Sequence, residues 1–544
     1  MELPVQPCIA TVSLSGDLQQ KMTAAAAAGF EAIELIEQDL LASGLNVTSV
    51  RQLAADLGIE IAAFQPCRDI EGMPEPHRKA VFDRVARQLD IAASLGARML
   101  LVCSAVSPVA LADQGRAAAD LAALADLTQA RGLKVGYEAL SWGTHVASHS
   151  SAWQIVQRAD HPALGLVLDS FHSLVLDIPT DDIPAIPGDR IFLVQIADAP
   201  RLQMEIIRLS RHHRRLPGLG DLDLTRFIAA VEATGYAGPL SVEVFSDELR
   251  ATEPVATARD AMLSFAGLRA RQAPQRLGTK RIALPETFRT RRPVEAALRS
   301  LPSDRLRSLG VRLSIDQAQG SVRMMLDPQP DLAINGSRPA VEEVPLRGLF
   351  HKAGISGVDH LLVQGPPGAS RRAKLGLSAA LRLGWRDLPD LPDPDGPIHL
   401  SRLDTEAIRF LMATPATERA DAHLPAEQQD SLDADLLCLA TADILAASEA
   451  LVDAGHKLLP VPQAHLDVSG AQLGLSDLLM AKLAAAEVFL DADDNGWFQQ
   501  VFLARPFDGT VISVAQRCGS YAGYGLGNAA IWLSHRRRLD QNRR

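Results

Sequence analysis

Short apolar segments rich in β-branched residues alternate with longer segments of helical periodicity over the first half of the chain. This alternation predicts repeated strand–helix units and a parallel sheet. Eight units fit between residues 8 and 265, which is the number and length expected of a closed (β/α)₈ barrel of the TIM type. The predicted strands are Cys8–Leu14, Phe30–Leu35, Glu60–Phe64, Ala97–Cys103, Lys134–Ala139, Leu164–Asp169, Ile191–Ile196 and Pro239–Val244.

The segments between these strands are rich in helix-forming residues and end in glycine, as in DLQQKMTAAAAAG and RAAADLAALADLTQARG. We expect them to be the outer helices of the barrel. The competing α/β layout, an open doubly wound sheet, needs a glycine-rich phosphate loop after the first strand. The segment VSLSGDL at that place carries a single glycine, so the barrel is favoured.

A change of composition divides the chain. Residues 271–295 are basic, contain proline and have no periodicity, which is typical of a linker between a barrel at 1–270 and a second domain at 296–544. The second domain alternates shorter strand-like segments with a few helices and is predicted to be α+β. Its acidic, proline-rich segment RDLPDLPDPDGP (386–397) is predicted to be an exposed loop.

Composition excludes several classes of protein. A chain of 544 residues is too long for one core, and 47% hydrophobic with 22% charged residues is ordinary for a globular protein. The net charge of −11 argues against nucleic-acid or anionic-membrane partners. No signal peptide or apolar run of about 20 residues is present, so we expect a cytoplasmic protein. Five scattered cysteines without a CxxC pair argue against a disulfide framework or a zinc site.

Four polar residues lie at the carboxyl ends of consecutive predicted strands, where barrel enzymes carry their chemistry. Each alone could be an ordinary strand-end residue with a hydrogen-bond partner. Three carboxylates and one amide oxygen converging from neighbouring strands instead form a hard oxygen-donor set that suits a divalent cation such as Mg²⁺, Mn²⁺ or Co²⁺. These predicted metal ligands are Glu138, Asp169, Gln195 and Glu243.

Histidine and arginine residues follow the same strands. His172, three residues after Asp169, is our candidate general base, with Glu138 as the second catalytic candidate. Arg68 and Arg214 are candidates for binding a substrate carboxylate, because arginine pairs with carboxylates through two parallel hydrogen bonds. Arg211, His212, His213 and Arg215 belong to the same basic run as Arg214, and the sequence leaves open which of the arginines contacts substrate.

Several motifs in this order resemble the sugar-phosphate isomerase/epimerase (xylose-isomerase-like) superfamily, and more narrowly the bacterial two-domain 3-dehydroshikimate dehydratases. They are GFEAIELIEQDL, FQPCRDIEGMP, GYEALSWGTHV, LDSFHSL, VQIADAP, SRHHRRLPGLGDLD and SVEVFSD. The resemblance implies that the four predicted metal ligands hold the catalytic metal. It also implies that Arg68, His172 and Arg214 face the substrate. Gln38 and His213 depart from the family pattern, which has asparagine and an aromatic residue at these positions.

The chemistry implied by this family is the dehydration of 3-dehydroshikimate to protocatechuate in quinate and shikimate catabolism, with a divalent metal, Mg²⁺ first. The substrate has a ketone with a neighbouring hydroxyl that a cation can chelate, and a second hydroxyl β to the ketone. A base such as His172 could take the α proton. The same site could also isomerise a sugar or cyclitol, but the arginines favour a carboxylated substrate.

The second domain resembles the vicinal-oxygen-chelate fold of 4-hydroxyphenylpyruvate dioxygenase through GVDHLLVQG, LLCLATADILAASEALVDAGHKLLPVP and VISVAQRCGSYAGYGLGN. The iron site of that fold needs two histidines and a carboxylate. His360 matches the first ligand, while Leu436 and Ser513 stand at the other two, so an active dioxygenase is disfavoured. A sensor or binding protein dominated by this domain remains the alternative to an enzyme acting through the barrel. The sequence leaves open the preferred metal, the role of this domain and whether the chain forms a homo-oligomer.

Overall fold

A computed structural model gives the fold of the chain. It describes residues 6–272, 353–381, 383–393, 396–404, 409–415, 432–504 and 510–541, together with 311–316, 321–326 and residues 301 and 306. The chain separates into two compact units, Met1–Val294 and Glu295–Arg544.

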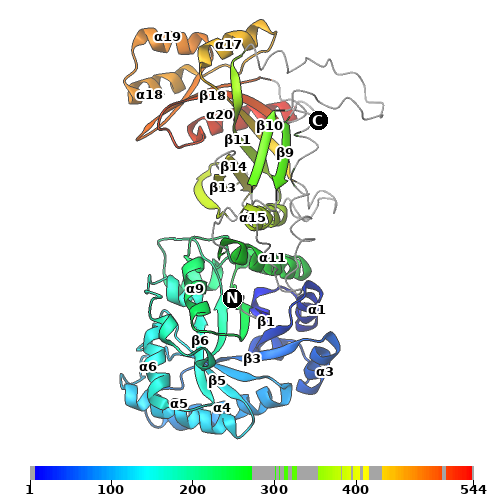
Figure 1. Cartoon of the computed structure of the whole chain (residues 1–544), viewed down its shortest axis with the longest axis vertical. Coiled ribbons are helices and arrows are strands. Elements are labelled where there is room, and N and C mark those ends of the chain that lie inside the picture. Colours follow the sequence, from blue (N-terminus) through cyan, green and yellow to red (C-terminus); the bar gives the residue numbers. More distant parts are fainter. Residues whose placement is uncertain are drawn as a thin grey trace. The chain divides into compact units, whose positions relative to one another are not determined.

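The first unit is a closed barrel of eight parallel strands in sequential order, as predicted (Figure 1). β8 pairs with β1 through the Cys8↔Ser241 register and closes the barrel. The first strand is shorter than predicted, because a 3₁₀ turn follows it at Thr11–Ser13. The strands are β1 (Gln6–Ala10), β2 (Ala32–Ile36), β3 (Glu60–Cys67), β4 (Met99–Cys103), β5 (Lys134–Glu138), β6 (Leu164–Asp169), β7 (Ile191–Ile196) and β8 (Pro239–Val242).

The predicted helices surround the barrel, as Figure 1 shows for α3, α4, α5 and α6. Gly29 ends the first helix in the left-handed conformation, with φ of 92°, which supports the use of glycine as a helix-end signal. The main helices are α1 (Leu18–Ala28), α2 (Glu37–Ala42), α3 (Val47–Leu57), α4 (His77–Leu95), α5 (Gln114–Gln129), α6 (His149–Ala159), α7 (Ser170–Leu174), α8 (Ile206–His212), α9 (Leu224–Ala233), α10 (Asp247–Arg250) and α11 (Pro254–Gln272). Of the predicted linker, 271–272 belong to α11 and 273–295 lie outside the described residues.

The second unit is α+β, as predicted. Its main sheet has the strand order β12-β13-β14-β11-β15-β18-β17-β16, and a separate hairpin joins β9 (Val311–Asp316) to β10 (Ser321–Leu326). The strands of the sheet are β11 (Ile355–Gln364), β12 (Arg386–Leu391), β13 (Ile398–Asp404), β14 (Arg409–Pro415), β15 (Asp433–Thr441), β16 (Phe489–Asp493), β17 (Gly496–Phe502) and β18 (Val511–Gly519). Its helices are α15 (Pro367–Leu381), α17 (Ile444–Asp453), α18 (Gln463–Leu473), α19 (Asp477–Ala485) and α20 (Ala529–Gln541).

The prediction of an exposed loop at 386–397 is wrong over the first half of that segment, where Arg386–Leu391 form β12. Among the described strands, β12 lies at the edge of the sheet and pairs with β13 alone. An edge strand tolerates Pro389, because the side without a neighbour needs no backbone N–H donor. The register shifts between Leu388 and Leu391, across the proline.

No helix among the described residues is long and apolar enough to cross a membrane.

Candidate active site

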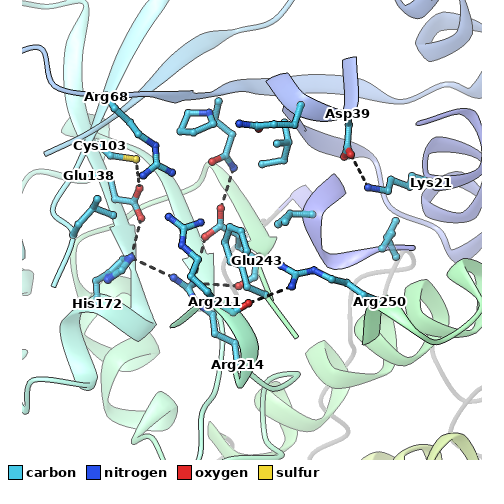
Figure 2. Close-up of a pocket in the computed structure, with 18 of the residues that line it drawn as sticks. Lys21, Asp39, Arg68, Cys103, Glu138, His172, Arg211, Arg214, Glu243 and Arg250 are labelled. Atoms are coloured by element: carbon cyan, nitrogen blue, oxygen red, sulfur yellow. Dashed lines mark hydrogen bonds and ion pairs between the residues drawn. The ribbon is translucent and has the colours of Figure 1, made fainter. Parts of the chain in front are cut away.

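A cavity of about 460 Å³ opens over the carboxyl ends of the barrel strands, where the sequence analysis placed the chemistry (Figure 2). Its volume is in the range of small-molecule sites. Strand ends contribute Gln65, Cys103, Glu138 and Glu243 to the lining. The loops and short helices that follow the strands contribute Gln38, Arg68, Trp142, His172, Arg211, Arg214, Phe245 and Arg250.

The four predicted metal ligands are all buried, with exposed fractions of 4% or less. Burial raises the pKa of Glu138 to about 8, and the neighbouring carboxylates of Glu243 and Asp169 add to the shift. Burial also raises the pKa of Asp169 and of Glu243. Three buried carboxylates that repel one another form a site at which positive charge is stabilising.

Arg214 supplies part of that positive charge. Its guanidinium is 1% exposed, and Nη1 lies 2.8 Å from Oδ2 of Asp169 and 3.3 Å from Oε2 of Glu243. The guanidinium also lies 4.4 Å from the ring centre of Phe171. The residue lines the cavity, as expected of a substrate-facing group, but most of its donors are engaged by the protein itself.

His172 lies between Glu138 and Arg214 at the cavity wall (Figure 2). Its Nε2 is 3.2 Å from Nη2 of Arg214, and its Nδ1 is 3.1 Å from the backbone N–H of Ser141. Nδ1 also lies 3.0 Å from the hydroxyl oxygen of Ser141, which can accept the single proton of a neutral ring, while Nε2 faces the N–H donor of Arg214. This arrangement favours the neutral imidazole over the imidazolium. Burial, reinforced by the charges of Arg214 and Arg211, lowers the pKa of His172 well below its ordinary value. The ring is neutral at physiological pH, the state that a general base requires.

Arg68 and Arg211 contribute two further cations to the cavity. Within the described part of the chain, neither guanidinium forms a hydrogen bond or an ion pair. Arg211 packs its guanidinium 4.8 Å from the ring centre of Phe245 and 5.7 Å from that of Trp142. Burial lowers the pKa of Arg211, and the positive charges of Arg68 and Arg214 lower it further. These two cations repel each other and are available to an anionic ligand.

The rest of the basic run faces elsewhere. Arg215 donates through Nη1 to the carbonyl oxygen of Leu219 at 3.1 Å. His212 lies 3.0 Å from Oδ2 of Asp247, and His213 is at the end of α8 outside the cavity lining. Among the arginines that the sequence left open, the structure therefore brings Arg211 and Arg214 to the cavity.

The residues present fit a divalent metal ion. Ligand atoms of Glu138, Asp169 and His172 lie within 4.8 Å of one another. The amide oxygen Oε1 of Gln195 is buried and has no hydrogen-bond partner among the described residues. A buried carbonyl oxygen without a partner is costly, and a cation would compensate it together with the repelling carboxylates.

Several polar residues of the site were not identified from the sequence. Lys21, Asp39 and Arg250 line the cavity, and Cys103, Glu34 and Gln65 contact the proposed ligands. Cys103 donates from Sγ to Oε2 of Glu138 at 3.2 Å. Gln65, which lines the cavity, donates to Glu34 below it. Glu34 lies in the middle of an apolar strand, IELI. The signal that identified Glu138, a carboxylate within an apolar run, was therefore present in β2 as well.

In the second unit, His360 is buried beside Cys438, one of the five scattered cysteines. Register pairing aligns His360 with Cys438 on β15, and Cys438 with Ser513 on β18. Nδ1 of His360 lies 2.8 Å from Asp359, and its Nε2 has no partner within the described residues. Leu436 packs in the apolar cluster of the sheet, and Ser513 accepts a hydrogen bond from Gln500.

Comparison with known proteins agrees with this architecture. Residues 22–266 match the family model of the xylose isomerase-like TIM barrel. A 3-dehydroshikimate dehydratase of Pseudomonas aeruginosa is 32% identical over 97% of this chain and 98% of its own length. One from Pseudomonas putida is 48% identical over 261 residues, which cover 48% of this chain and 41% of that protein. A solved structure described as a xylose isomerase-like TIM barrel/4-hydroxyphenylpyruvate dioxygenase fusion protein superposes with a TM-score of 0.77 at 29% identity, covering 98% of this chain and 99% of its own.

Proposed function

The chain belongs to the 3-dehydroshikimate dehydratase family, and from this premise we propose that its barrel removes water from 3-dehydroshikimate to give protocatechuate. One observation supports the proposal most strongly. Two carboxylates of the buried oxygen-donor set, Glu138 and Glu243, line the same cavity as two arginines without carboxylate partners in the described structure. Asp169 lies directly behind this lining, with a ligand atom within 4.8 Å of one of Glu138. The donor set suits a ketone with a neighbouring hydroxyl, and the arginines suit the substrate's carboxylate.

Glu138, Asp169, Gln195 and Glu243 are the residues we propose to hold a divalent cation, with Mg²⁺ first and Mn²⁺ or Co²⁺ as substitutes. A bound cation supplies Lewis-acid polarisation of the ketone and so makes the α proton more acidic. Arg214 neutralises part of the carboxylate charge through Asp169 and Glu243, and it keeps these side chains in place.

His172 is the proposed general base. It is neutral, buried at the cavity wall, and its Nε2 lies 3.7 Å from Glu138 and 3.6 Å from Asp169. It takes the proton α to the ketone, and the two carboxylates stabilise the imidazolium that results. The imidazolium returns the proton to the β hydroxyl, which leaves as water when the carbon–oxygen bond breaks. The ring then becomes aromatic by tautomerisation.

Arg68 and Arg211 are the proposed carboxylate-binding pair. The Arg214 guanidinium is already bound by Asp169 and Glu243, so it is the less suitable partner for a substrate. The stacking of Arg211 on Phe245 and Trp142 fixes its planar group without using its N–H donors. Binding a carboxylate between two cations relieves their repulsion.

We propose a structural role for the second unit. A facial iron site needs three protein ligands. The position expected of the second ligand carries Leu436, which is 3% exposed within an apolar cluster, and Ser513 at the third is already hydrogen-bonded to Gln500. Asp359 and Cys438 offer ligand atoms within 4.8 Å of His360, but the Asp359 carboxylate is already bound by Arg517 at 2.6 Å. The described residues around His360 therefore lack the second histidine and the free carboxylate of a facial iron site.

The activity can be tested with the purified full chain, 3-dehydroshikimate and Mg²⁺ by following the ultraviolet absorbance of the aromatic product. We expect protocatechuate and water in equal amounts. Shikimate, which has a hydroxyl in place of the ketone, and a cyclitol ketone without a carboxylate are the matched controls and should react poorly. Isomerisation of the cyclitol without aromatisation of 3-dehydroshikimate would contradict the proposal and favour a sugar or cyclitol isomerase.

A further inference from the structure

A fully buried carboxylate below the cavity joins three strands. Glu34 of β2 is 0% exposed. Its Oε2 accepts hydrogen bonds from Nε2 of Gln65 and from Nε2 of Gln195, both at 2.8 Å. Its Oε1 accepts from the hydroxyl of Ser241. The donors come from β3, β7 and β8. The side chain of Glu34 therefore links its own strand, β2, to three other strands of the barrel.

This network sets the orientation of the Gln195 amide. A side-chain amide has a donor end and an acceptor end, and Oε2 of Glu34 is an acceptor here, because the Gln65 amide donates to the same oxygen. The Nε2 end must therefore face Glu34. The Oε1 end is left buried and without a partner in the described structure, as a lone oxygen donor for the proposed metal.

The same carboxylate acts on a second proposed ligand through Gln65. Nε2 of Gln65 donates both to Glu34 and, at 3.0 Å, to Oε1 of Glu243. Glu34 itself does not line the cavity, and both its oxygens are already occupied by donors. It is thus placed to orient ligands without being one.

We propose that Glu34 is a positioning residue that holds Gln195 and, through Gln65, Glu243 in the orientation in which they bind the divalent metal. This inference rests on the proposed ligand set. Hydrogen-bond partners of metal ligands fix which ligand atom is presented and limit its rotation. Glu34 does so for two ligands on two neighbouring strands, β7 and the end of β8.

The test is Mn²⁺ binding to the purified full chain without substrate, followed by electron paramagnetic resonance of the free ion. Glu34→Gln keeps size but can present either end of an amide to Gln195, so the Kd for Mn²⁺ should rise about 10–100-fold. Glu71→Gln is the matched control. It changes another buried barrel carboxylate outside this network and should leave the Kd within about twofold.

A double-mutant cycle separates positioning from a general loss of structure. If Glu34 acts through Gln195, combining Glu34→Gln with Gln195→Ala should weaken binding by clearly less than the product of the two single effects. Independent, multiplicative effects would overturn the proposal, as would a Glu34→Gln variant that keeps the wild-type Kd. Should Glu34→Gln fail to fold, Gln65→Met breaks the link to Glu243 at nearly constant volume, and an unchanged Kd there would also overturn it.

Failure of the ligand set itself gives a different result. Glu243→Ala removes a proposed ligand directly. If Mn²⁺ binding is unaffected by Glu243→Ala, the proposed metal site is wrong. If Glu243→Ala abolishes binding and Glu34→Gln does not weaken it, only the positioning role is wrong.

Discussion

Replacing Glu71 by glutamine should change how the stability of the protein depends on pH. Glu71 is 4% exposed and belongs to the loop after β3 that carries Arg68. Its Oε1 accepts from the backbone N–H of Ala105 at 2.6 Å and from the hydroxyl of Tyr137 at 2.8 Å. Its Oε2 is buried without a partner in the described structure. Burial raises the pKa of this carboxyl from 4.5 to about 7.

The raised pKa of Glu71 determines whether stability rises or falls with pH. A carboxyl whose pKa is raised on folding binds its proton more tightly in the folded state, so its contribution is fully present below about pH 4.5 and is lost as the pH rises through about 7. At about 1.4 kcal/mol per pKa unit, the wild type should lose about 2–3 kcal/mol between pH 5 and pH 8 that a neutral glutamine does not lose. The glutamine carbonyl can keep both hydrogen bonds.

Thermal unfolding of the full chain at pH 5 and pH 8 measures this. A change of 1 kcal/mol shifts the Tm of a domain of this size by about 2–4 °C. The Tm of Glu71→Gln minus that of the wild type should therefore be about 4–12 °C larger at pH 8 than at pH 5. Glu75→Gln, an exposed change in the same loop, is the control and should follow the wild type. The reasoning is refuted if the Tm difference between Glu71→Gln and wild type is the same at both pH values.

Three further predictions concern the proposed roles. His172→Ala should lower kcat by about 100-fold or more, as expected for loss of a general base; a change in KM alone would move the base role to Glu138. Arg68→Ala and Arg211→Ala should each raise KM about 10–100-fold with little change in kcat, because a lost charge-assisted hydrogen bond weakens ground and transition states alike. Arg215→Ala is the control from the same basic run, and an equal KM effect there would contradict the assignment. The full chain with Fe²⁺, oxygen and 4-hydroxyphenylpyruvate or protocatechuate should consume no oxygen; uptake that His360→Ala abolishes would show a working iron site in the second unit.

The barrel could be predicted because its signals are local. Each strand is an apolar run, and the strands follow one another around the barrel in sequence order. The carboxylates of Glu138 and Asp169 stood out because they end such runs, and strand ends of a barrel meet on one face. Closing the barrel then brings residues far apart in the chain into one cavity.

What could not be predicted depends on three-dimensional packing. The run RHHRR gives no means of telling Arg214, which is 1% exposed beside Asp169, from Arg215, which bonds to a loop carbonyl. Glu34 carried the same signal as Glu138 but lies in mid-strand, and its role appears only when β3, β7 and β8 bring its donors together. β12 was mistaken for a loop because proline suits both a loop and the edge of a sheet.

The most direct test of the central claim is turnover of 3-dehydroshikimate before and after removal of divalent metal. The full chain treated with a chelator and freed of it should form no protocatechuate, and Mg²⁺, Mn²⁺ or Co²⁺ should restore the rate. The Glu243→Ala variant should stay orders of magnitude slower at any concentration of these ions. Full activity in a sample verified to be free of metal, or a Glu243→Ala rate within tenfold of wild type, would contradict the account.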